Sequence, residues 1–294
     1  MRSILAAATL LAATPAPAQS LPKPVHDMVE AAARSGDRVK IDAVVAIAKE
    51  TNKGAEAEID AIVAHHAAIR AAQRQATLAE AGLFDNWKGR GQVGASLSTG
   101  NSDVRSLTVG LNLQREGVAW RHRLDAAFDI TDNRKGSDQE RILTGYQLDY
   151  KISERAYSWA RLEYERNREA GIKRRFAESA GLGWRAIQGK AVRWDLEAGP
   201  ALRQTKFVYY DENSVAGRGA SRFAWKFSRH TEFSSDTAIF FDSSATINTT
   251  AALTSRMFGA IGTRLSYNLA WEEDPPNGLR SLDTTTRITL VYDF

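Results

Sequence analysis

Few residues of this sequence have the types and spacing that catalysis requires. The stretch GASLSTG (94–100) is close to a nucleophile elbow, but Ser98 stands where the G-x-S-x-G pattern needs its last glycine. His122 lies on the same face of an expected strand as Trp120 and Leu124, so we expect it to face outward near the end of that strand, as an interfacial residue and not as a general base. The sequence therefore predicts no enzyme; an outer-membrane lipase-like enzyme remains the least favoured alternative.

Metal ligands are equally sparse. His65 and His66 are adjacent on an expected helix, where they point about 100° apart and cannot share one ion. The acidic residues of the stretch 132–138 are offset by Arg134 and Lys135 and lack the spacing of a calcium loop. The chain has no cysteine, which excludes disulfides and thiolate sites. We expect no metal site and no cofactor.

The first residues have the form of a secretory signal peptide. Arg2 precedes a short apolar run, and Ala16-Pro17-Ala18 matches an A-x-A cleavage site. We assign 1–18 to this peptide and 19–84 to an alanine-rich helical arm, which Gly36 and the stretch 51–54 divide into two or three helices. A net charge of +4 without a Lys/Arg stripe gives no support for nucleic-acid binding.

From Trp87 onward the sequence alternates with a period of two, which is typical of strands. Twelve strands are expected between 85 and 294, with turns that alternate between short and long. They span 89–99, 103–116, 119–131, 139–151, 155–167, 174–187, 191–206, 217–228, 231–242, 247–258, 261–272 and 282–294. Short turns at one end and longer, polar loops such as 132–138 and 207–216 at the other are typical of an outer-membrane barrel.

One face of these strands is rich in charge of both signs, as a wet or ion-paired lumen requires. The predicted lumen-lining residues are Arg121, Arg123, Asp125, Asp149, Glu163, Arg185, Arg193, Asp195, Glu197, Arg203 and Arg222. Aromatic residues recur near the strand ends, where membrane barrels carry aromatic girdles. The predicted girdle contains Trp120, Trp159, Trp184, Trp194, Trp225 and Trp271, with Tyr157 at the same rim and Phe240 at the other.

The final strand carries an outward row that ends in an aromatic residue: Ile288, Leu290, Tyr292 and Phe294. This row resembles the signal read by the outer-membrane barrel assembly machinery. The fold class expected is therefore all-β, a 12-stranded antiparallel transmembrane β-barrel preceded by a short α-helical N-terminal arm. Its partners would be outer-membrane lipids, the assembly machinery and periplasmic chaperones, and any partner of the arm is not readable.

The stretch FDNWKGRGQVGASLSTGNSDVRSLTVGLNLQRE and the ending WEEDPPNGLRSLDTTTRITLVYDF resemble the salt-induced outer-membrane protein family related to YdiY, a domain of unknown function. The resemblance covers about 85–294, the whole expected barrel. It implies an outer-membrane location in a Gram-negative bacterium and a link to osmotic or salt stress, and it supplies no catalytic residues.

Two function classes follow from these observations. One is an envelope structural or osmotic-stress protein whose charged lumen is narrow or plugged by side chains, with its helical arm in the periplasm. The other is a passive channel for ions or small solutes. Twelve strands lie between eight, which side chains can fill, and sixteen, which leave an aqueous channel, so strand number alone does not decide.

Overall fold

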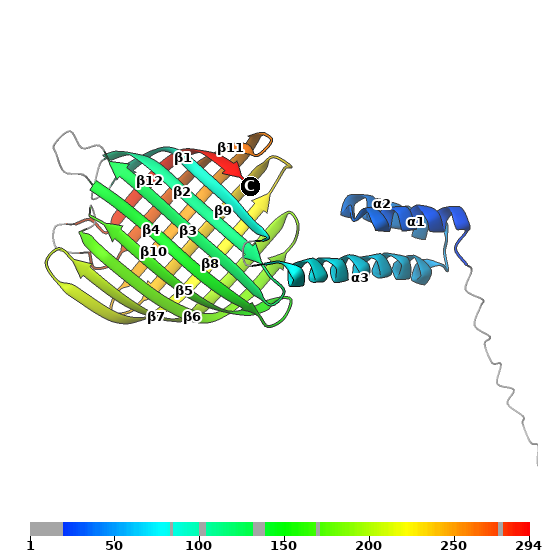
Figure 1. The fold of residues 1–294 in the computed structure, drawn as a ribbon, viewed down its shortest axis with the longest axis horizontal. Helices are drawn as coiled ribbons and strands as arrows, with labels where there is room; N and C mark the ends of the chain where they lie inside the picture. The colour runs from blue at the N-terminus through cyan, green and yellow to red at the C-terminus, as the bar shows by residue number, and fades with distance from the viewer. Residues whose placement is uncertain (1–19, 83–84, 100–103, 132–138, 169–170, 276–278) are drawn as a thin grey trace, which may run out of the picture. The chain divides into compact units, whose positions relative to one another are not determined.

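The structure is a computed structural model that describes residues 20–82, 85–99, 104–131, 139–168, 171–275 and 279–294. The expected signal peptide and the loops 100–102 and 132–138 lie outside these residues. The chain divides into two compact units, residues 1–80 and 81–294 (Figure 1).

The first unit consists of three helices, α1 (Lys23–Ser35), α2 (Arg38–Thr51) and α3 (Glu56–Glu80). Gly36 ends α1 in the left-handed conformation, φ 68°, which a glycine adopts without strain. Asp37 caps α2 by accepting a 3.0 Å hydrogen bond from the Val39 amide. Val29 of α1 and Ile59 of α3 are fully buried between the helices. In the described residues, no helix is both long enough and apolar enough to cross a bilayer.

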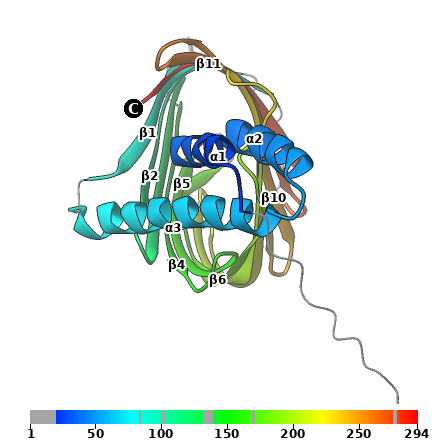
Figure 2. The same cartoon turned by 90° about the vertical axis from the view of Figure 1, so that its right-hand side faces the viewer.

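The second unit is a closed barrel of twelve antiparallel strands in which each strand pairs with its sequence neighbours and β1 pairs with β12 (Figures 1 and 2). The strands are β1 (Trp87–Thr99), β2 (Val104–Glu116), β3 (Trp120–Thr131), β4 (Gln139–Lys151), β5 (Ala156–Asn167), β6 (Ile172–Gln188), β7 (Val192–Phe207), β8 (Asp211–Lys226), β9 (Thr231–Phe241), β10 (Ala245–Phe258), β11 (Ile261–Glu272) and β12 (Leu282–Asp293). The predicted fold class is confirmed.

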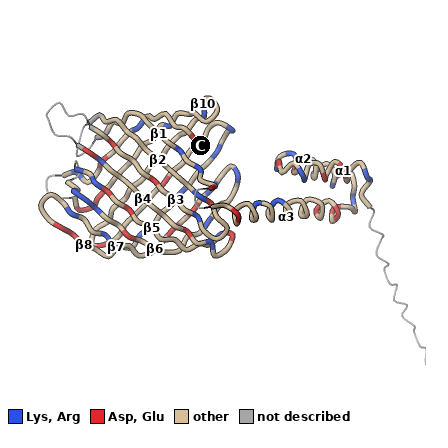
Figure 3. The backbone as a smooth tube through the Cα atoms, in the orientation of Figure 1, with Lys and Arg blue, Asp and Glu red and all other residues tan. Residues whose placement is uncertain are grey.

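The two faces of the strands differ sharply in chemistry. Large apolar side chains on the outer face are open to the surroundings: Leu107 is 52% exposed, Leu182 67% and Ile288 65%. The alternate positions point into the lumen and are mostly polar or charged, and charged residues recur along the strands (Figure 3). A soluble protein rarely exposes so much apolar surface, whereas a barrel that faces lipid requires it.

One strand boundary was predicted wrongly. The sequence places a loop at 207–216, yet β8 begins at Asp211 and the connection is only 208–210. The polar run Asp-Glu-Asn-Ser has turn-like composition, but the register of β7 extends over it, from Leu202↔Val215 to Lys206↔Asp211. The expected contrast between long loops and short turns therefore fails at this hairpin.

Candidate functional site: the charged lumen

The lumen has two walls of different composition. Inward positions of β3 to β8 carry most of the arginines, aspartates and glutamates. Inward positions of β9 to β12, β1 and β2 are mainly short and polar. Examples of the second wall are Ser96, Thr108, Thr246, Thr254, Ser266 and Thr285. Charged side chains are therefore denser on the side of the barrel that β3 to β8 form.

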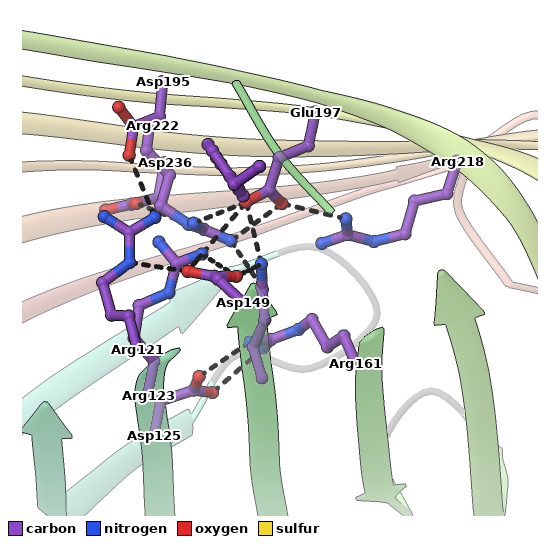
Figure 4. Close-up of polar contacts among 12 residues, drawn as sticks. Arg121, Arg123, Asp125, Asp149, Arg161, Asp195, Glu197, Arg218, Arg222 and Asp236 are labelled. Atoms are coloured by element: carbon purple, nitrogen blue, oxygen red, sulfur yellow. Dashed lines mark hydrogen bonds and ion pairs between the residues drawn. The ribbon is translucent and has the colours of Figure 1, made fainter. Parts of the chain in front are cut away.

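Glu197 of β7 lies at the centre of the charged wall, and its side chain is 1% exposed. Five side chains from β3, β4, β5 and β8 donate hydrogen bonds to its carboxylate (Figure 4). The donors are Tyr157 Oη at 2.9 Å, Gln147 Nε2 at 2.8 Å, Arg123 Nη2 at 3.0 Å, Arg222 Nη1 at 3.0 Å and Arg218 Nη1 at 3.4 Å. A buried carboxylate is stable only with such pairing.

Asp149 of β4 is the second buried carboxylate, with a fully covered side chain. Arg121 Nε donates to it at 2.6 Å and Arg123 Nη2 at 3.0 Å. Gln147 Nε2 donates to both Asp149 and Glu197 at 2.8 Å, so one amide and one guanidinium join the two acids. We call Tyr157, Gln147, Asp149, Glu197 and the arginines 121, 123, 218 and 222 the central cluster.

Strand register explains how Tyr157 reaches Glu197. Tyr157 of β5 lies opposite Gly183 of β6, which lies opposite Glu197 of β7. A Cβ atom added to Gly183 would lie 2.2 Å from the Tyr157 ring. The missing side chain leaves the space that the ring crosses, so glycine is required at this position.

Arginines stack on aromatic rings along the same wall. The Arg121 guanidinium lies 5.1 Å from the Tyr157 ring centre, and Arg218 lies 4.9 Å from that of Trp159. Arg203 and Arg218 both lie over Phe240, at 5.0 and 5.8 Å. The rings attract the cations and hold their side chains in fixed positions across the lumen.

These contacts correct three predictions about the aromatic residues. Trp159, expected in the outer girdle, is 3% exposed and faces inward, as does Tyr157. Both share the parity of Arg161, so the alternation that placed the charges inside also places these rings inside. Phe240, expected at the opposite rim, is buried in the lumen as well.

The end of the lumen away from the short turns is narrowed by further ion pairs. Arg175 contacts Glu165 at 3.1 Å and Glu272 at 2.9 Å, and so joins β6 to β11 across the barrel. Arg203 contacts Asp242, which follows β9, at 3.4 Å. Burial acts to raise the pKa of Asp242, but hydrogen bonds from Ser214 and from the Ser244 amide, with the charge of Arg203, lower it overall.

Three cavities share lining residues and follow one another along the lumen. The largest, about 810 Å³, opens near the short turns and is bordered by Lys88, Arg193 and Phe294. It shares Arg161 with a second cavity of about 210 Å³. The second shares Arg175 with a third of about 40 Å³ at the other end. The free space therefore tapers toward Arg175.

Charge around the largest cavity is unequal, because nine basic and five acidic side chains line it. The basic ones are Lys88, Arg90, Arg123, Arg161, Arg193, Arg218, Arg222, Lys226 and Arg256; the acidic ones are Asp125, Glu163, Glu232, Asp236 and Asp293. Several are paired, as Arg161 is with Asp125 at 3.0 Å. The surplus makes this part of the lumen attractive to anions.

The structure places the predicted lumen residues as follows. Arg121, Arg123, Asp149, Glu197 and Arg222 meet in the central cluster; Asp125 and Glu163 both contact Arg161; Asp195 contacts Arg121; Arg185 stacks on Tyr157; Arg203 contacts Asp242; and Arg193 is 59% exposed beside Glu232. Sequence reasoning missed Arg161, Arg218 and Gln147. Each lies two or four residues from a predicted lumen residue on the same strand, so the period-two alternation could have placed all three inside.

The outer face carries the remaining tryptophans. Trp120, Trp184 and Trp225 are 46%, 49% and 46% exposed, Trp194 is 37% exposed, and Trp271 is half-buried. His122 also faces outward, with Nδ1 2.8 Å from the Tyr146 hydroxyl and its ring beside Trp87. These contacts are those of an aromatic belt and give the lipase alternative no support.

The last residues form the seam between β12 and β1. Ile288, Leu290, Tyr292 and Phe294 are 65%, 56%, 54% and 57% exposed on the outer face. The Phe294 amide donates to the Gly89 carbonyl at 2.9 Å, and the Gly89 amide donates back at 2.8 Å. The Phe294 ring lies over Gly89, where an added Cβ would be 2.2 Å from it.

The fold and the lumen define the class of protein: it is a closed antiparallel β-barrel with an apolar exterior and a charged lumen. Residues 91–294 match the model of a family described as proteins of unknown function, DUF481, and the chain belongs to that family.

Individual proteins are similar to the chain at lower identity. The uncharacterized protein YdiY of Escherichia coli K12 is 22% identical over 210 residues, 70% of this chain and 82% of YdiY. The solved NanC porin is 10% identical, with a TM-score of 0.49 over 69% of this chain and 100% of NanC. The translocator domain of the autotransporter NalP from Neisseria meningitidis is 11% identical, with a TM-score of 0.44 over 79% of this chain and 97% of that domain.

Proposed function

We propose that this protein is an outer-membrane barrel that forms a narrow, anion-preferring passage, constricted by the ion pairs of its charged wall. The observation that carries the proposal is the tapering series of cavities with a surplus of basic side chains around its widest part. The apolar exterior supports a membrane location. The protein has no enzymatic role in this proposal.

The passage would be restrictive because long side chains occupy one half of the lumen. In a narrow passage, charged groups set electrostatic barriers for each permeating ion. Arg193 is the most suitable residue for a test of selectivity, since it borders the largest cavity, is 59% exposed and approaches Glu232 only to 3.6 Å. Its charge is therefore available to ions, and its removal does not orphan a buried acid.

The decisive experiment is the reversal potential of purified protein in a planar bilayer under a KCl gradient. Wild-type protein is expected to show small single-channel steps and a preference for chloride. Arg193→Gln and Lys226→Gln, tested singly, should each lower that preference and leave the melting temperature unchanged, because the other cation stays beside Glu232. Lys206→Gln is the matched control, because it removes one charge on the outer side of β7. Cation preference in the wild type, or equal effects of all three variants, would refute the proposal.

A second candidate function is favoured by the constriction itself. The third cavity measures only about 40 Å³, and Arg175 with its two acids lies beside it. If the ion pairs of Arg175 close the lumen, the barrel is a structural protein of the envelope and not a channel. The osmotic-stress role implied by the resemblance would then depend on the barrel as a structural part of the membrane. No conductance from wild type, with conductance gained in Arg175→Ala, would identify this closed form. Growth of a deletion strain at raised NaCl would test the stress role in either case.

We also propose that residues 1–18 are removed as a signal peptide and that the helical unit resides in the periplasm. The short turns and Phe294 would then lie on the periplasmic side. The two longer loops expected from the sequence, 132–138 and 207–216, would then reach the cell surface, and an epitope tag at 134–135 should be accessible there. A tag at 211–213 would fall within β8. A tag at 209 replaces it. Surface labelling at 209 and none at 189 is the expected result, and labelling at 189 alone would invert this topology.

A further inference from the structure

Two histidines and two carboxylates gather on the helical unit. His26, Asp27 and Glu30 of α1 each offer a ligand atom within 4.8 Å of the others. His66 of α3 adds an imidazole, with Nε2 3.7 Å from Glu30 Oε1. The group combines a His–Glu pair at positions i and i+4 on one helix with a histidine from another helix.

The packing of α1 against α3 fixes this arrangement. At one end, the Leu21 amide donates to Glu58 at 2.9 Å; at the other, the Arg70 guanidinium donates to the Ala33 carbonyl. These contacts run in the same direction along both helices, so α1 and α3 are parallel. His66 precedes Arg70 by one turn and lies level with Glu30. Its side chain is only 16% exposed, so its ring is held at the helix–helix contact.

The distances are near those of a metal site. Zn²⁺ bound by nitrogen and oxygen at about 2.0–2.2 Å places neighbouring ligands roughly 3.3–3.5 Å apart. The pair His66–Glu30 is at 3.7 Å, His26–Asp27 at 3.7 Å and His26–Glu30 at 4.0 Å. His66 lies outside the group whose ligand atoms are all within 4.8 Å of one another, so an ion bound by His26, Glu30 and His66 requires the His26 side chain to turn toward α3. His26 and Asp27 have room for such a rotation, because their side chains are 40% and 62% exposed.

Arg34 influences the availability of Glu30. Arg34 Nη2 donates to Glu30 Oε1 at 2.6 Å, and the other carboxylate oxygen, Oε2, faces His26 at 4.0 Å. The arginine orients the carboxylate and also competes with a cation for it, so its removal is informative.

We propose that His26, Glu30 and His66, with Asp27 at the edge, bind a borderline divalent cation such as Zn²⁺ or Ni²⁺. Imidazole nitrogens favour these ions, whereas Mg²⁺ and Ca²⁺ prefer all-oxygen sites. The bound ion would connect α1 to α3. Sequence reasoning excluded a site at His65 and His66 because adjacent side chains diverge on a helix; the structure instead brings His66 to Glu30, 36 positions earlier in the chain.

The test uses the full chain in detergent, purified without a polyhistidine tag. Zn²⁺ titration by calorimetry is expected to show one site per chain, and Co²⁺ is expected to give visible absorption bands of a nitrogen–oxygen site. His66→Ala and Glu30→Gln should weaken Zn²⁺ binding at least tenfold. His65→Ala is the matched control, because its ring is exposed one position away. Helical circular dichroism verifies that each variant is folded.

The outcomes separate cleanly. Retention of one site in wild type and His65→Ala, with loss in His66→Ala and Glu30→Gln, supports the proposal. Arg34→Ala should bind at least as tightly as wild type, because a competing cation is gone. Absence of Zn²⁺ binding in the wild type overturns the proposal, as does equal loss in His65→Ala and His66→Ala. None of these results depends on whether the barrel conducts.

Discussion

The Tyr157 hydroxyl on β5 donates a 2.9 Å hydrogen bond to Glu197 Oε1 on β7, and the Tyr157 ring passes over Gly183 of the intervening strand β6. The ring is 1% exposed and the carboxylate 1%. This contact ties the aromatic part of the charged wall to its acidic centre. The stability of the barrel should therefore respond to changes at the intervening glycine.

Gly183→Ala is expected to destabilise the barrel. The new Cβ would lie 2.2 Å from the Tyr157 ring, which has to shift and weaken its bond to Glu197. Overpacking of this kind costs about 1–3 kcal/mol of the free energy of unfolding. The temperature at which the folded band disappears in a gel-shift assay measures the effect. Gly219→Ala is the control, since no atom lies within 4 Å of its added Cβ. Equal melting of the two variants would show that the ring does not need the space.

Glu197→Gln tests the central cluster. The change removes one charge and leaves the buried Arg218 and the partly buried Arg123 and Arg222 with fewer acids. Loss of one member of a buried ion pair costs roughly 3–5 kcal/mol, so urea unfolding should shift to clearly lower concentration. Glu154→Gln in an exposed turn should have no effect. If the two variants unfold alike, the cluster contributes nothing to stability.

Asp242→Asn should alter the acid dependence of stability. Because the folded pKa of Asp242 is lowered below its ordinary 3.8, its ionised form stabilises the fold above that pH. This contribution is lost as the pH falls through the lowered value. The variant should therefore melt below wild type at pH 7, and the difference should shrink in acid. A gap that is constant with pH would contradict the assignment; Asp211→Asn, an exposed carboxylate, is the control.

Phe294→Ala is expected to reduce the amount of folded protein in the outer membrane and to increase periplasmic degradation. The ring covers Gly89 on the first strand, and the outward row resembles an assembly signal. Phe258→Ala removes an even more exposed aromatic residue, 76%, at the same end and serves as the control. Wild-type levels of heat-modifiable barrel in Phe294→Ala would mean that the last residue is not part of a signal.

Local alternation was enough to predict most of the barrel. The expected strands 139–151 and 261–272 match β4 and β11 at both ends, because a period of two needs only neighbouring residues. Trp159 was misplaced because its aromatic character was weighted above its parity with Arg161. The hydrogen bond from Arg222 to Gln147, 75 residues away, depends on how the five strands β4 to β8 are staggered and on the rotamers of both side chains. The alternation within a single strand specifies neither the stagger nor the rotamers.

The hydrogen bonds between β1 and β12 have a consequence for the time course of folding. Arg90 and Asp293, joined at 2.6 Å, are 203 positions apart, so the first strand has no second neighbour until the twelfth arrives. Throughout that interval its free amides and carbonyls can pair with any other extended chain. Closure over so long a loop is intrinsically slow. Aggregation during biogenesis should therefore begin at β1, and an excess of added β12 peptide should act as a competitive inhibitor of closure.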